Sequence, residues 1–202
     1  MPTERVETSK KSEAHEDKRQ FIIEQCASLF DRVGYHKASM QMLAEEVGIG
    51  KPTLYHYFPS KHAILYAIHD AHMDRLLVGL DRPEGDNPLD SLQSACADIL
   101  TQIAEHPGYV RAFMDHYADL EGEMRGKIRQ QRQDYFQKLI SIIEDGVAQG
   151  SINPCDPTMT TYAFLGMCNW AYKWYPAMAD DLAPDEAAAQ LCAPLFAGLR
   201  KD

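Results

Sequence analysis

The stretch that decides the fold reads GIGKPTLYHYFPSK and runs from Gly48 to Lys61. Its glycines, lysine and threonine suggest a loop that binds nucleotide phosphates. Such a loop has the pattern Gly-x-x-x-x-Gly-Lys-Ser/Thr and follows a strand, because successive backbone N–H groups must surround the phosphate. Glu45 stands where the first glycine is required, and Pro52 stands where the Ser/Thr is required. The preceding segment also has helical rather than strand periodicity, so the pattern excludes a nucleotide-binding loop.

The same stretch fits a helix-turn-helix when it is taken with the residues before it. Ser39 is a good N-cap for a short helix that ends at Gly48. Pro52 suits the first turn of the next helix, which has Leu54 as its apolar anchor. The small side chain of Ala44 lets the two helices cross closely, and Gly48 tolerates the positive φ of the turn. This spacing predicts two short helices joined by a tight turn.

Helical periodicity continues through almost the whole sequence, and no window shows the alternation of a strand. Beyond residue 82 we expect helices at about 89–105, 107–119, 122–148, 157–175 and 184–200. The sequence therefore predicts an all-α protein. We expect a three-helix helix-turn-helix domain over 17–62 and a second, helical domain over 63–202. Residues 1–16 are polar and lack periodicity, so we expect a disordered tail there.

The net charge of −10 is unevenly distributed along the chain. Residues 1–62 carry nine Lys/Arg and nine Asp/Glu, whereas residues 63–202 carry eleven and twenty-one. The whole negative excess therefore lies in the second part. A polyanion such as DNA can approach the first part and is repelled by the second.

The composition is that of a soluble globular protein, with 45% apolar and 25% charged residues. No stretch reaches the roughly 18 apolar residues of a membrane span, and the first residues lack the apolar core of a secretory signal. We therefore expect a cytoplasmic protein with no membrane contact. The five cysteines include no Cys-x-x-Cys pair, which favours reduced thiols over a zinc site or a disulfide framework.

No motif in the sequence indicates catalysis or a cofactor. The chain has no nucleophile elbow, no metalloprotease histidine pair and no diagnostic pair of carboxylates. His69 and His72 have the spacing to share a metal, but no third ligand is evident near them. His106 and His116 fit ordinary helix positions. We expect no enzyme activity, no cofactor and no metal site.

The run from Phe30 to Leu65, FDRVGYHKASMQMLAEEVGIGKPTLYHYFPSKHAIL, closely resembles the N-terminal domain of the tetracycline-repressor (TetR) family. The residues that carry the match are Gly34-Tyr35, Ala44, Glu45, Gly48, Leu54-Tyr55, Tyr57-Phe58 and Ser60-Lys61. Gly50 departs from the pattern, where a serine is common, and so does Pro52, where a small residue is usual. The resemblance implies a homodimeric, ligand-responsive transcriptional regulator. It implies a repressor that a small apolar effector releases from a palindromic operator in double-stranded DNA.

The resemblance also implies which residues bind DNA, since the second helix of the motif enters the major groove. The implied DNA contacts are Ser39, Lys51, Thr53, Tyr55, His56, Tyr57 and Lys61. Lys51 and Thr53 stand at the tip of the recognition helix and are candidates for base or phosphate contacts. Tyr57 fits a core position equally well.

The last two expected helices carry more apolar surface than one chain can bury. The helix at 157–175 is apolar nearly all round, so one face needs either a second subunit or a ligand. In the TetR family the last two long helices form the dimer seam, and the helices at 157–175 and 184–200 resemble that pair. The resemblance implies a homodimer in which residues 63–202 form the ligand-binding and dimerisation domain.

Aromatic and methionine side chains of the second part could line an effector pocket, although each fits a hydrophobic core as well. They are Phe113, Met114, Tyr117, Tyr135, Phe136, Tyr162, Met167 and Trp170. Arg111, Arg125 and Arg129 could meet an anionic headgroup, and solvated positions explain them equally well.

The segment GMCNWAYKWYP, at residues 166–176, resembles a run found in TetR-family regulators of lipid and sterol breakdown. That resemblance implies an acyl-CoA, fatty-acid or steroid-like effector. The alternatives are a repressor of the same family that responds to drugs or aromatic compounds, a helical adaptor that binds protein, and a small helical hydrolase.

Overall fold

The structure is a computed structural model that describes residues 3–81 and 87–200. Within these ranges the regular structure is helical, apart from one isolated antiparallel bridge between Ile152 and Arg200. The predicted all-α class is confirmed. None of the helices in these ranges combines the length and apolarity needed to span a bilayer.

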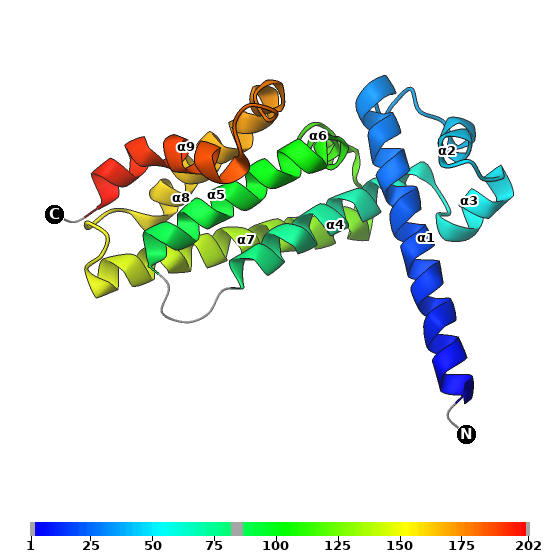
Figure 1. Cartoon of the computed structure of the whole chain (residues 1–202), viewed down its shortest axis with the longest axis horizontal. Helices are drawn as coiled ribbons and strands as arrows, with labels where there is room; N and C mark the ends of the chain where they lie inside the picture. The colour runs from blue at the N-terminus through cyan, green and yellow to red at the C-terminus, as the bar shows by residue number, and fades with distance from the viewer. Residues whose placement is uncertain (1–2, 82–86, 201–202) are drawn as a thin grey trace.

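The first three helices form the predicted helix-turn-helix domain (Figure 1). They are α1 (Thr3–Val33), α2 (Met40–Val47) and α3 (Lys51–Tyr57). The Ser39 hydroxyl caps α2 by accepting a 3.2 Å hydrogen bond from the Met42 N–H. Gly48 ends α2 with a φ of 72°, a conformation that costs glycine little. Local residue types thus set the lengths of both short helices.

The helix α1 begins earlier than the sequence predicted. Residues 1–16 were expected to be a disordered tail, but α1 is helical from Thr3, and residues 1–2 lie outside the described ranges. The segment is rich in Glu and Lys, which are good helix formers even where no apolar face exists. His15 also stacks on Tyr57 with the ring centroids 4.8 Å apart. Figure 1 shows this part of α1 extending beyond the neighbouring helices.

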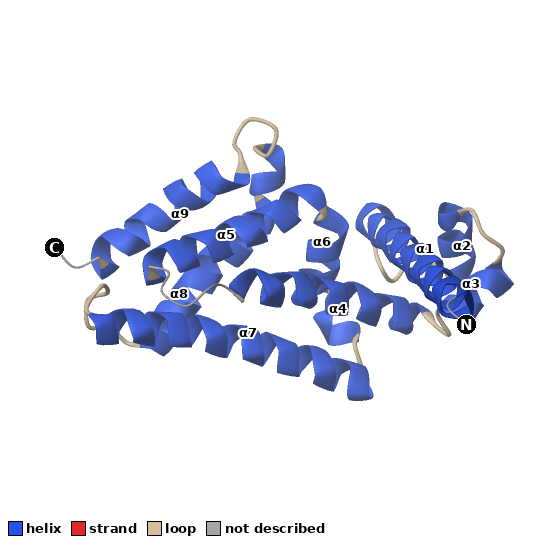
Figure 2. Cartoon of the chain, turned by 60° about the horizontal axis from the view of Figure 1, so that its bottom comes forward, coloured by secondary structure: helices blue, strands red, loops and turns tan. Residues whose placement is uncertain are grey.

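The second part is a bundle in which α4, α5 and α7 run side by side (Figure 2). Its elements are α4 (Lys61–Leu80), α5 (Pro88–Glu105), α6 (Pro107–Asp115), the 3-10 helix η1 (Tyr117–Asp119), α7 (Gly122–Gln149), α8 (Pro157–Trp170), the 3-10 helices η2 (Ala171–Lys173) and η3 (Tyr175–Ala177), and α9 (Pro184–Leu199). The helix expected at 157–175 leaves the α conformation at Trp170. The segments Ala171–Lys173 and Tyr175–Ala177 form 3-10 helices instead, and Pro176 has no N–H with which to continue an α-helix.

Both parts share one hydrophobic core, which runs from Ile22 in α1 to Leu199 in α9. The helix α4 contacts α1 as well as α5, α6 and α7. The helix α6 lies against α1 so closely that a Cβ added to Gly108 would come within 2.6 Å of the Ala27 carbonyl oxygen. The helix-turn-helix is therefore packed directly on the bundle.

Candidate DNA interface and ligand cavity

The helix α3 buries one face and exposes the other. Leu54 within α3, and Phe58 at its end, are buried in the core. The opposite face exposes Lys51, Thr53, Tyr55 and His56. Four of the seven predicted DNA contacts thus share one surface, and Ser39 is exposed at the start of α2. A helix held by a buried anchor and exposing lysine, hydroxyl and imidazole groups can present hydrogen-bond donors to a DNA groove.

Two lysines on or near this surface carry positive charge that no carboxylate in the described ranges neutralises. Lys51, and Lys37 in the turn before α2, are exposed and form no ion pair with any residue the structure describes. Arg32, in contrast, is already paired with Glu46 at 2.7 Å. Both lysines are therefore free to meet phosphates. Lys37 was not predicted from the sequence, because it lies in a turn outside the two short helices.

Two of the predicted DNA contacts have other partners in the structure. Tyr57 is half-buried and stacks on His15 of α1. The Lys61 Nζ donates hydrogen bonds of 2.9 Å to the backbone carbonyls of Tyr35 and Ala38, and burial lowers the pKa of Lys61. Lys61 thus fastens the turn between α1 and α2 to the start of α4. A phosphate contact by either side chain stays a prediction.

The bundle contains a cavity of about 500 Å³ between α4, α5, α6, α7 and α8. The residues that line it are Met73, Leu76, Ile99, Phe113, Arg132, Gln133, Tyr135, Phe136, Gln137, Tyr162, Leu165 and Asn169. Its walls are mainly apolar and aromatic, and the polar groups come chiefly from α7. Such a cavity suits a small molecule with an apolar body.

Half of the residues predicted for the pocket line this cavity. Phe113, Tyr135, Phe136 and Tyr162 do so, whereas Met114, Tyr117, Met167 and Trp170 do not. Met114, Tyr117 and Met167 pack against the core instead. Trp170 leaves 63% of its surface exposed. These four lie away from the cavity because apolar character does not specify which side of a helix a residue occupies, and a ligand contact by any of the eight stays a prediction.

Arg132 is the charged residue of the cavity, and it was not predicted from the sequence. Its guanidinium lies 4.2 Å from the ring centroid of Phe113 and 4.3 Å from that of Tyr117. Burial lowers the pKa of Arg132, and no carboxylate in the described part of the chain pairs with it. The predicted Arg111 instead pairs with Asp31 at 2.8 Å. A guanidinium that lies among aromatic rings beside the Tyr117 hydroxyl, with no carboxylate partner among the described residues, can bind an anionic group through two parallel hydrogen bonds.

The histidine pair of α4 lies deep in the bundle. His69 and His72 are buried, with ring centroids 5.3 Å and 4.4 Å from that of Phe113. Burial lowers the pKa of both histidines from 6.5 to about 3, so they are neutral at pH 7. Another group of polar side chains, His36, His116 and Asp119, places its ligand atoms within 4.8 Å of one another and could hold a metal ion.

The outer face of α8 is apolar and exposed. Met159, Tyr162 and Trp170 expose 63%, 60% and 63% of their surfaces. The small residues Ala163 and Gly166 are exposed between them. Neighbouring α9 exposes Ala193, Pro194, Ala197 and Gly198, which permit close packing by another helix. Contiguous apolar surface of this kind marks an interaction site.

Comparisons with known proteins match both parts of the chain. The model described as "Bacterial regulatory proteins, tetR family" matches residues 22–68, and "Tetracyclin repressor-like, C-terminal domain" matches residues 85–199. The HTH-type transcriptional repressor KstR of Rhodococcus jostii is 30% identical over 58% of this chain and 58% of its own.

Two solved structures extend the likeness to the whole fold. PfmR, a TetR family transcriptional regulator from Thermus thermophilus, is 28% identical with a TM-score of 0.80, over 89% of this chain and 99% of its own. AibR, solved in complex with isovaleryl coenzyme A and operator DNA, is 28% identical with a TM-score of 0.74, over 87% and 97%.

Proposed function

The chain belongs to the TetR family of bacterial regulatory proteins, and on this premise we propose that it is a homodimeric repressor released from its operator by a small anionic effector. One observation carries the proposal: α3 buries Leu54 and exposes Lys51, Thr53, Tyr55 and His56 on one surface. The regulator acts where chromosomal DNA lies, in the cytoplasm.

In the proposed complex, α3 lies in the major groove. Lys51 and Thr53 face the base edges or the adjoining phosphates, and Tyr55 and His56 donate to phosphates. Ser39, at the N-terminus of α2, approaches a further phosphate, where the exposed N–H groups of the helix favour an anion. A dimer joined through α8 and α9 presents two copies of α3, so the operator has two half-sites about one helical turn apart.

The experiment for DNA binding measures operator affinity across a salt series, using DNA from upstream of the gene. We expect nanomolar affinity that falls steeply with salt, because phosphate contacts release counterions. Lys51→Ala tests the contact, and Lys138→Ala is the control, since Lys138 lies on α7 and pairs with Asp81. If Lys51 contacts a phosphate, its loss lowers the salt slope by about 1; if it contacts a base, its loss relaxes the sequence preference. Unchanged affinity and slope in Lys51→Ala would refute the assignment.

The effector class follows from the cavity. Its volume of about 500 Å³ lies within the usual range of small-molecule sites, roughly 300 to 1,000 Å³. An apolar wall with one guanidinium that has no carboxylate partner in the part of the chain that the structure describes favours an apolar body that carries a carboxylate, phosphate or similar anion. AibR, which binds isovaleryl coenzyme A, provides a precedent among the structural relatives. We propose an acyl-CoA or another apolar acid, with its anionic group on Arg132.

The test for the effector adds acyl-CoA thioesters of increasing chain length to the DNA complex. We expect the thioester to release DNA from the parent protein. We expect Arg132→Met to need at least about tenfold more thioester for the same release. Methionine keeps an apolar stem between Phe113 and Tyr117 and removes the charge. Equal release from both proteins would contradict the role of Arg132. Release by neutral aromatic compounds alone would favour a drug-responsive repressor of the same family.

A further inference from the structure

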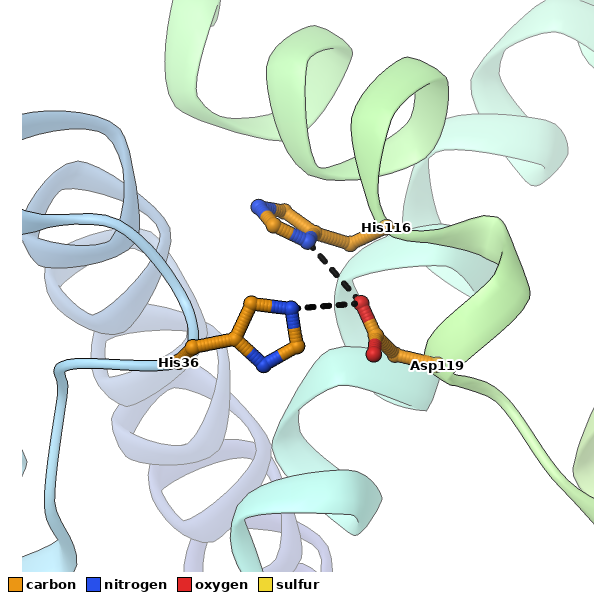
Figure 3. Close-up of side chains that lie close together, drawn as sticks. All are labelled: His36, His116 and Asp119. Carbon is orange, nitrogen blue, oxygen red and sulfur yellow. Dashed lines mark hydrogen bonds and ion pairs between the residues drawn. The ribbon is translucent and has the colours of Figure 1, made fainter.

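A polar cluster lies where the helix-turn-helix domain meets the bundle (Figure 3). His36 lies in the turn between α1 and α2, His116 follows the last residue of α6, and Asp119 ends η1. The three side chains point toward one another from two different parts of the chain. His36 is largely exposed, at 72%, whereas His116 and Asp119 are mostly covered.

The distances within this cluster suit a metal ion. Asp119 Oδ2 lies 3.0 Å from His116 Nδ1 and 3.5 Å from His36 Nε2, and all three ligand atoms lie within 4.8 Å of one another. In a tetrahedral zinc site, bonds of about 2.0 to 2.2 Å place neighbouring ligand atoms about 3.3 to 3.6 Å apart. Small side-chain rotations would therefore bring all three atoms to bonding distance of one ion.

We propose that His36, His116 and Asp119 bind a divalent transition-metal ion, such as Zn²⁺, that joins the helix-turn-helix domain to the bundle. Two imidazoles and one carboxylate are a ligand set that suits zinc and neighbouring late transition metals. The exposure of His36 leaves room for water as a fourth ligand.

The turn that carries His36 is held in place without the ion. Lys61 donates to the carbonyls on both sides of His36, those of Tyr35 and Ala38, at 2.9 Å. The ring of Tyr35 is buried beneath the cluster, with centroids 5.3 Å from that of His116 and 5.4 Å from that of His36. Preorganisation of this kind lowers the entropic cost of bringing the ligands together.

The position of the site gives the ion a regulatory consequence. His116 lies three residues beyond Phe113, which lines the cavity, while His36 belongs to the helix-turn-helix domain. An ion held by both opposes any movement between them, because binding favours the arrangement in which the ligands are close. This coupling rests on the proposed function, but metal binding itself does not.

The first experiment titrates the metal-free full-length protein with Co²⁺ and follows visible absorption, with Zn²⁺ binding measured by calorimetry. We expect one ion per chain and the intense bands of tetrahedral cobalt. His36→Ala and Asp119→Asn should each weaken binding by more than about tenfold. His15→Ala is the matched control, because it removes an exposed histidine of α1 outside the cluster, and it should bind the metal like the parent. Circular dichroism without metal checks that every variant folds.

Equal affinity in the parent and both ligand variants would overturn the site, as would the weak spectrum of six-coordinate cobalt. The second experiment repeats effector release with and without Zn²⁺. We expect Zn²⁺ to change the effector concentration needed for release severalfold in the parent and not in His36→Ala. Metal binding without this difference would support the site and refute the coupling.

Discussion

Replacing Gly108 by alanine should weaken the junction between the helix-turn-helix domain and the bundle. Gly108 lies in the first turn of α6, where the backbone of α1 passes directly over it. A Cβ at this position would stand 2.6 Å from the carbonyl oxygen of Ala27 and 2.7 Å from its carbon. These are backbone atoms in the middle of a helix, so they cannot rotate away as a side chain would.

The size of the effect follows from these distances. To restore ordinary van der Waals contact, α6 must move away from α1 by roughly 0.8 Å. Overpacking of this kind costs about 1 to 3 kcal/mol. The better helix propensity of alanine offsets up to about 1 kcal/mol. We expect a net loss of about 1 to 2 kcal/mol, which in a chain of this length lowers Tm by about 2 to 8 °C.

The assay is thermal unfolding followed by circular dichroism, with Gly126→Ala as the control. Gly126 also lies in a helix, α7, but a Cβ there meets nothing within 4 Å. Alanine should therefore raise the stability of that variant by about 0.5 to 1 kcal/mol. If Gly108→Ala melts at or above the parent temperature, the close packing of α6 on α1 is refuted. The comparison separates a packing effect from the general effect of glycine replacement.

Three further predictions follow from buried and exposed side chains. Burial lowers the pKa of His69 and His72 to about 3, so the unfolded state takes up protons before the folded state as pH falls below 6.5. The free energy of unfolding should then fall by up to about 1.4 kcal/mol per pH unit for each histidine. Denaturant titrations at pH 7 and pH 5 measure this loss, and equal stability would contradict it. Trp170→Asp should place a charge in the exposed apolar face of α8 and convert dimer to monomer in light scattering; an intact dimer would exclude that face as the interface. Cys155 is half-buried and the other four cysteines are buried, so a thiol reagent should modify Cys155 first in the native protein, and mass spectrometry would show any other order.

The parts of the fold that depend on local chemistry could be predicted from the sequence. The cap at Ser39, the left-handed turn at Gly48 and the proline in the first turn of α3 each act within a few residues. Such signals define where short helices begin and end whatever surrounds them. With the ends of α3 defined, the apolar anchor Leu54 was enough to predict which face of the helix is exposed. The polar start of α1 was misjudged because helix propensity acts there without an apolar face.

The contacts that could not be predicted from the sequence join residues distant in the chain. Lys61 bonds to carbonyls more than twenty residues away, and His36 meets Asp119 only because η1 folds back toward the first turn. Arg132 could not be distinguished from Arg129, one turn earlier on α7, by type or spacing. Trp170 was assigned to the pocket because the sequence does not distinguish an apolar residue that faces a cavity from one that faces a second subunit.

The continuous core limits how this regulator can be recombined with others. In a hybrid sensor whose residues 1–62 come from another regulator, the turn after α1 and the residue at position 61 would both come from the donor. The donor α1 would, however, lie over Gly108 of this chain. The donor α1 would have to follow the same path over α6, and the donor turn would have to fit the corner formed by His116 and Asp119. Interchangeable function therefore requires matched surfaces on α1 and α6, and a cut at the end of the DNA-binding sequence motif is not sufficient.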